Sequence, residues 1–131
     1  MRFFRKRLAR VTIGFLLVAM PWPCLARQHA TEHWIACVEA TCRVTAADGG
    51  RGTGCAFERS QGHVFLLTGA HVATSTTVQC EFWRAGHQSR PLPGQVILRD
   101  EASDVAVVAI AESTLAGHSP PVVPLAPAGS D

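Results

Sequence analysis

Lysine is absent after the first ten residues of the sequence, and acidic residues outnumber basic ones there. Those ten residues hold the single lysine and four arginines. From Arg27 onward, seven arginines stand against ten acidic residues, a formal charge of 7 − 10 = −3. A protein that binds nucleic acid needs a basic face for the phosphates. The sequence therefore predicts no nucleic-acid partner.

A hydrophobic run long enough to cross a membrane is also missing. The apolar run at 11–20 is shorter than the ~20 residues that a spanning helix needs. It follows the cationic segment 1–10 and precedes a Pro-Trp-Pro breaker and a Cys-Leu-Ala site that ends at Ala26. This three-part plan is typical of a secretory signal peptide. We expect residues 1–26 to be removed and the product to be exported, periplasmic or secreted, with no membrane contact afterwards. An uncleaved membrane anchor is the alternative.

Close cysteine pairs of the C-x-x-C kind are lacking as well. Structural zinc sites commonly use such pairs, so the sequence predicts neither a metal site nor another cofactor. Removal of residues 1–26 leaves Cys37, Cys42, Cys55 and Cys80, an even number of cysteines in an oxidising compartment. This composition favours two disulfide bonds.

Internal repeats and amphipathic helices are absent from the hydrophobic pattern, which instead consists of short apolar stretches separated by turns. Asp48-Gly49 is a preferred centre for a two-residue β-hairpin turn. Regular spacing of short strands argues for an all-β barrel or sandwich. A single helical turn over 111–117 and a proline-rich extended tail are expected to follow. The six expected strands cover residues 41–46, 54–59, 63–67, 76–83, 94–99 and 104–110.

A histidine follows one of these apolar strands, and an aspartate precedes another. A histidine that acts as a general base needs an acid to hold its ring in one tautomer and to stabilise the imidazolium. His71 and Asp104 are the candidates for these two roles. Asp104 comes directly before a very apolar stretch, V-A-V-V-A-I. A carboxylate at such a position is costly to bury unless it is paired. The plainer interpretation is that each residue is a polar cap at a strand end.

Four short motifs resemble the trypsin-like serine peptidase family, and more closely its bacterial HtrA-type members. T-G-A-H-V at 68–72 resembles the T-A-A-H-C and L-T-N-A-H-V stretches around the catalytic histidine of those peptidases. G-T-G at 52–54 is similar to their upstream G-S-G strand. D-E-A-S-D-V-A-V-V-A-I at 100–110 resembles D-x-x-x-D-L-A-V-L-K, and V-V-P-L at 122–125 resembles L-P-V-x-P-L.

The resemblance implies a chymotrypsin-like fold and assigns a role to each candidate residue. It implies that residues 35–127 form a six-stranded antiparallel β-barrel, the first of the family's two barrels. A lead-in at 27–34 precedes it and a truncated connector at 128–131 follows. In this interpretation His71 is the general base and Asp104 is the acid that orients it.

The family's nucleophile motif, G-x-S-G-G, does not occur in the sequence, and all seven serines lie in other contexts. In the family that serine belongs to the second barrel. We therefore expect the N-terminal half of an exported trypsin-like serine endopeptidase, with a protein or peptide substrate and a second β-barrel as partner. A cysteine nucleophile in that second barrel stays open. The alternative is a non-catalytic secreted β-barrel module that binds a protein partner.

The disulfide pairing depends on the turn at Asp48-Gly49. With a two-residue turn, residues whose numbers sum to 97 face each other, which pairs Cys42 with Cys55. Cys37 and Cys80 then remain, and the resembling fold places its first and fourth strands side by side, so a Cys37–Cys80 bond is compatible with it. The rival pairing joins Cys37 to Cys42 and Cys55 to Cys80.

Overall fold

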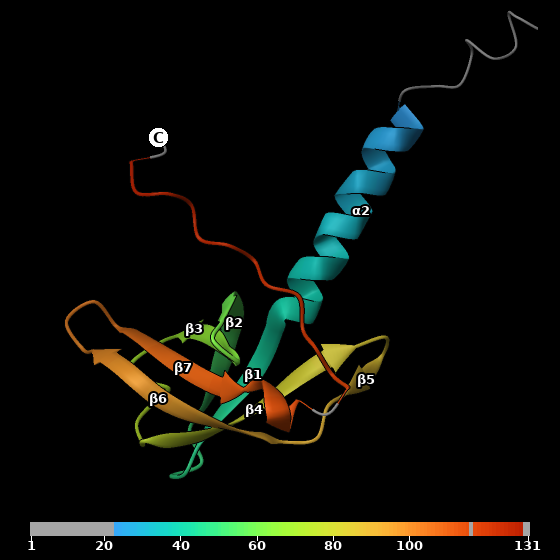
Figure 1. Ribbon diagram of the computed structural model, residues 1–131. Coiled ribbons are helices and arrows are strands. Elements are labelled where there is room, and N and C mark those ends of the chain that lie inside the picture. Colours follow the sequence, from blue (N-terminus) through green and yellow to red (C-terminus); the bar gives the residue numbers. More distant parts are fainter. Residues whose placement is uncertain (1–22, 116, 130–131) are drawn as a thin grey trace, which may run out of the picture. The chain divides into compact units, whose positions relative to one another are not determined.

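The computed structural model describes residues 23–115 and 117–129 of the protein (Figure 1). Most of the expected signal peptide lies outside the described residues. The elements are α2 (Pro23–Ala40), β1 (Thr41–Ala46), β2 (Arg51–Ser60), β3 (His63–Thr68), β4 (Thr77–Arg84), β5 (His87–Gln88), β6 (Leu92–Asp100), β7 (Val105–Ala111) and the 3₁₀ turn η1 (Glu112–Thr114). The six expected strands are confirmed as β1, β2, β3, β4, β6 and β7, with ends that shift by up to three residues.

Helix α2 is a feature that the hydrophobic pattern does not predict. Its sequence lacks an apolar stripe at helical spacing, which is the usual signal for a helix. It is instead rich in alanine and begins at Pro23, and both favour helix formation through the backbone alone. The first residues of the expected barrel region, 35–40, belong to this helix. Among the described residues, no helix is both long and apolar enough to span a bilayer.

The six long strands form a closed antiparallel barrel, as the fold prediction states. The order of neighbouring strands is β1-β2-β3-β7-β6-β4, and a further ladder between β1 and β4 closes the ring. β5 is a two-residue strand that pairs only with the end of β4. The barrel lies within one compact unit that begins at His33. Closure leaves none of the six long strands with a free barrel edge.

The barrel core follows from the period-two pattern of the strands. In β1, β3 and β7, every second side chain is buried, while the intervening side chains are less buried or exposed. Each large apolar side chain that is buried in this way stabilises the fold by roughly 1.5–3 kcal/mol. The largest of these inward side chains are Phe82, Leu66, Leu92, Ile110, Val44, Val64, Val78 and Val108.

The turn between β1 and β2 differs from the two-residue hairpin that the sequence predicts. The Ala46 N–H donates to the Gly50 carbonyl at 2.8 Å, and the Gly49 N–H donates to the Ala46 carbonyl at 3.0 Å. Gly49 has a φ of +87°. These are the marks of a three-residue loop whose last residue is left-handed. Residues whose numbers sum to 96, rather than 97, therefore face each other.

This one-residue difference overturns the geometric reason for a Cys42–Cys55 bond. Cys42 faces Gly54, and Cys55 faces Thr41. Because side chains alternate along a strand, the buried Cys42 points into the barrel, whereas the half-buried Cys55 lies on its outer surface. No disulfide bond joins any of the four described cysteines in the structure.

A close backbone approach at Gly52 links β2 to the segment that follows β3. A Cβ atom at this position would lie 2.3 Å from Cγ2 of Val72, far inside van der Waals contact. Val72 is buried and is the residue directly after His71. The glycine in the G-T-G motif thus lets the His71 segment pack against the barrel wall.

We predict that Gly52→Ala destabilises the protein by about 1–3 kcal/mol, the usual cost of forcing an extra methyl group into a packed site. Urea unfolding of a double-mutant cycle with Val72→Ala measures the effect. The shorter side chain at position 72 removes the two closest contacts and leaves only its Cβ, at 3.2 Å, so Gly52→Ala should cost clearly less in that background. An equal cost in both backgrounds would contradict the proposed contact.

Candidate active site

The ladder between β3 and β7 brings His71 and Asp104 to one end of the barrel. Thr68, the last residue of β3, faces Ala106 near the start of β7. His71 lies three residues beyond Thr68, and Asp104 is the residue just before β7. The two residues are 33 positions apart in sequence, yet they are direct neighbours in the fold.

Asp104 accepts two kinds of hydrogen bond from His71. The His71 backbone N–H donates to Oδ1 at 2.9 Å. The ring nitrogen Nδ1 lies 2.8 Å from Oδ1 and 2.6 Å from Oδ2. A carboxylate can only accept, so Nδ1 must carry the proton in this contact. In the neutral ring, this arrangement leaves Nε2 unprotonated and able to accept a proton.

The same contacts keep Asp104 ionised. The His71 backbone N–H lowers the pKa of the carboxyl below its usual value, and the hydrogen bond from the ring lowers it further. Each donor stabilises the charged form of Asp104 over the protonated form. Asp104 is thus a negative charge held beside the imidazole at neutral pH, which is the state that would stabilise a protonated ring.

The segment that carries His71 is a tight turn with a buried underside. The N–H groups of Val72 and Ala73 both donate to the Gly69 carbonyl at 3.1 Å. Ala70, Val72 and Ala73 are buried. A Cβ atom at Gly69 would lie 2.7 Å from Cε1 of His71, so the ring occupies space that a side chain at position 69 would take. The turn fixes the backbone of His71 while its side chain stays on the surface.

The β1–β2 loop anchors the far end of this turn. The Thr74 hydroxyl donates to Oδ2 of Asp48 at 3.0 Å, and the Ala47 N–H donates to the Ser75 hydroxyl at 3.3 Å. From the sequence, Asp48 is predicted only as a turn residue, and its contact with Thr74 is not predicted. Asp48 and Thr74 are 26 residues apart, and no local pattern pairs them.

Arg99 is a second supporting residue that the sequence analysis misses. Its Nε donates to the carbonyl oxygen of Ala70 at 3.1 Å, directly before His71. Its NH1 forms an ion pair with Glu101 at 3.0 Å. The contact with Ala70 crosses from β6 to the turn after β3, so only the folded barrel brings these groups together.

Asp100, the first aspartate of the D-x-x-x-D pattern, shapes the loop that presents Asp104. Its Oδ1 accepts from the Ala102 N–H at 3.0 Å, and its Oδ2 accepts from the Ser103 hydroxyl at 2.7 Å. Asp104 itself has a φ of +53°, a left-handed conformation that aspartate tolerates better than most residues. Such strained backbone is often found at functional sites.

The pair is open to solvent in this chain. The His71 side chain is 73% exposed and the Asp104 side chain is 53% exposed. Within the described residues, no serine hydroxyl hydrogen-bonds to His71. The structure therefore brings together the two candidate residues and leaves most of the His71 side chain exposed.

Three other histidines of the barrel unit differ in exposure. His63 and His87 are exposed. His118 differs: it is half-buried against Phe82, and burial lowers its pKa. The sequence holds one H-x-x-x-H spacing, His29 to His33, which is a spacing that zinc ligands also use. No group of three metal-ligating side chains occurs among the residues whose side chains are described.

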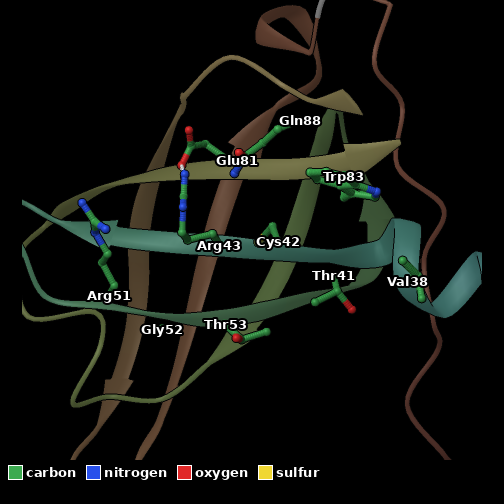
Figure 2. Close-up of a pocket in the computed structure, with 10 residues that line it drawn as sticks. All are labelled: Val38, Thr41, Cys42, Arg43, Arg51, Gly52, Thr53, Glu81, Trp83 and Gln88. Atoms are coloured by element: carbon green, nitrogen blue, oxygen red, sulfur yellow. Dashed lines mark hydrogen bonds and ion pairs between the residues drawn. The ribbon is translucent and has the colours of Figure 1, made fainter. Parts of the chain in front are cut away.

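A groove of about 610 Å³ lies on the outer surface of β1, β2 and β4, and neither His71 nor Asp104 lines it. Figure 2 shows Arg43 on its floor reaching toward Glu81, with which it forms an ion pair at 2.8 Å. Trp83 and Val38 contribute apolar surface at one end. Among the described residues, this groove and the His71 site are therefore separate from each other.

Comparison with solved structures identifies the fold. The chain is similar to the crystal structure of Deg5, with a TM-score of 0.58 and 17% sequence identity. The match covers 81% of this chain and 52% of the Deg5 chain, so the protein spans about half the length of that structure. No family model and no curated protein matches the sequence. The likeness shows the fold alone: a closed six-stranded antiparallel β-barrel, consistent with a chymotrypsin-like barrel.

We predict that the Asp104 carboxyl titrates below the usual aspartate value of about 3.9, as measured by ¹³C NMR. A lowered folded-state pKa means that Asp104 contributes stability above the unfolded value, and that this stability is lost as the pH falls through the folded value. His71→Ala should keep part of the lowering, because the backbone N–H at position 71 still donates. An Asp104 pKa at or above the usual value would contradict these hydrogen bonds.

Proposed function

We propose that this chain is the first barrel of an exported trypsin-like serine endopeptidase, with His71 as the general base and Asp104 as the acid that orients it. The observation that carries the proposal is the doubled contact at Asp104, which accepts from both the backbone and the ring of His71. The barrel fold shared with Deg5 supports it.

The proposed chemistry starts at Nε2 of His71. With Nδ1–H held by Asp104, Nε2 can take the proton of a serine hydroxyl as that oxygen attacks a peptide carbonyl. The imidazolium formed in this step lies beside the Asp104 carboxylate, which stabilises its charge. His71 then returns the proton to the leaving amine. Asp104 stays ionised throughout.

The nucleophile and the oxyanion donors are proposed to come from a second barrel. None of the seven serines in this chain lies in a G-x-S-G-G segment. The large exposure of His71 and Asp104 is consistent with a site that another domain covers. The 131-residue chain alone should hydrolyse no peptide, since a base without an activated hydroxyl and an oxyanion hole has nothing to deprotonate.

The experiment is to sequence the gene beyond codon 131 and to assay the extended protein with a panel of fluorogenic peptides. We expect an in-frame G-x-S-G-G segment within roughly the next hundred codons, and peptide hydrolysis by the extended protein. His71→Ala should abolish nearly all turnover. Asp104→Asn should lower kcat on the order of 10⁴-fold, because the amide favours the wrong ring tautomer.

His87→Ala is the matched control, since this histidine is exposed on β5 and has no place in the proposed chemistry. Its turnover should equal that of the unmodified protein. Hydrolysis by the short chain that survives His71→Ala would overturn the proposal. A verified stop codon after residue 131, with no hydrolysis, would favour the alternative of a secreted β-barrel module that binds a protein partner.

A further inference from the structure

The four described cysteines fall into two separate neighbourhoods of the barrel unit. Cys42 and Cys80 are buried inside the barrel, with 3% and 0% exposure. Cys37, near the end of α2, and Cys55, on the outer face of β2, are half-buried. These groupings match neither of the pairings that the sequence suggests.

Thr41 contacts Cys37 through a hydrogen bond and is paired with Cys55 in the sheet. The Thr41 hydroxyl donates to the carbonyl oxygen of Cys37 at 2.8 Å, which holds the end of α2 against the start of β1. Thr41 is also the direct partner of Cys55 in the β1–β2 ladder. Directly opposed residues have Cα atoms only ~4.5–5.5 Å apart, with side chains on the same face. The neighbouring Cys37 thiol adds to the effect of burial in raising the pKa of Cys55, as expected for two close sulfur groups.

Cys42 and Cys80 are also neighbours, but their geometry is less suited to a bond. Cys80 faces Val44 and Cys42 faces Phe82, so the two cysteines are diagonal partners across the β1–β4 ladder. Diagonal partners have Cα atoms ~7–8 Å apart, whereas a disulfide rarely spans more than ~7 Å.

The barrel interior accommodates this second pair as thiols. A Cβ atom at Gly54 would lie 3.2 Å from the Cys42 sulfur, and one at Gly94 would lie 3.1 Å from the Cys80 sulfur. The two glycines therefore leave room for the sulfur atoms. The hydrogen bond with Cys80 and burial both raise the pKa of Cys42 well above its usual range. A thiol that stays protonated and enclosed reacts poorly with oxidants.

We propose that Cys37 and Cys55 form a disulfide bond on the outside of the barrel, while Cys42 and Cys80 remain thiols inside it. The oxidant is a disulfide of the glutathione type. One cysteine thiolate attacks it and releases one reduced thiol. The second cysteine thiolate then attacks the resulting mixed disulfide, forms the Cys37–Cys55 bond and releases the second reduced thiol. Two protons and two electrons thus leave the protein with the two reduced thiols. The bond ties the end of α2 to β2.

Peptide mapping tests the proposal on the full chain carrying Cys24→Ser, oxidised in a glutathione buffer. Free thiols are alkylated after denaturation, and the chain is cut without reduction at arginine and glutamate. Glu39 lies between Cys37 and Cys42, so the two cysteines fall in different peptides. We expect H-W-I-A-C-V-E (33–39) linked to G-T-G-C-A-F-E (52–58), with alkylated Cys42 and Cys80. A bond to Cys42 or Cys80, or four alkylated cysteines after oxidation, overturns the proposal.

Thermal unfolding of matched variants gives an independent readout. Reduction should lower the Tm of the oxidised protein on the order of 10 °C, the expected effect of opening a loop of this size in a domain of about 100 residues. Cys37→Ser/Cys55→Ser should lose this redox dependence. Cys42→Ala/Cys80→Ala should keep it, even though the core loses stability. Redox dependence that disappears only in the Cys42/Cys80 variant would overturn the proposal. None of these outcomes depends on the proposed peptidase activity.

Discussion

The ladder between β3 and β7 is the constraint on which the candidate site depends. It runs antiparallel from His63 with Ala111 to Thr68 with Ala106, and the turn after β3 therefore meets the loop before β7. A shift of this ladder by one residue would reverse which side chains face the core, so the buried side chains of both strands hold the register in place. Apolar packing inside the barrel thereby fixes the positions of two polar groups outside it.

Support for the site comes from groups spread over the barrel rather than from its immediate sequence. Asp48 holds Thr74, Arg99 holds the carbonyl of Ala70, and Gly52 lets Val72 pack close to β2. Each contact holds the backbone on one side of His71, and none touches its ring. The imidazole itself is oriented by Asp104 alone among the described residues, which makes that carboxylate the group to examine.

Local patterns predict the strands well because alternation is a property of neighbouring residues. The β1 bounds, 41–46, follow from the pattern TCRVTA alone. The register could not be predicted, because Asp48-Gly49 suits both a two-residue and a three-residue loop, and Gly49 takes a positive φ in each. The pairing of Ala46 with Gly50 distinguishes the three-residue loop. Helix α2 escaped prediction because it lacks an apolar stripe.

The candidate pair was inferred from motifs, and its supporting residues were not. His71 and Asp104 stand in short stretches that resemble a known family. Arg99 contacts a residue 29 positions away in the sequence, and Thr74 contacts one 26 positions away. A local sequence pattern cannot predict contacts between residues so far apart. The cysteine neighbourhoods depend on the register, so they too required the structure.

The central claim is that Asp104 holds the ring of His71 in the tautomer with the proton on Nδ1. A long-range ¹H–¹⁵N correlation spectrum of the chain, at a pH where the imidazole is neutral, measures this directly. The account predicts a protonated Nδ1 and an unprotonated Nε2 for His71, and a loss of this preference in Asp104→Asn. A neutral ring protonated mainly at Nε2 in the unmodified chain would contradict it.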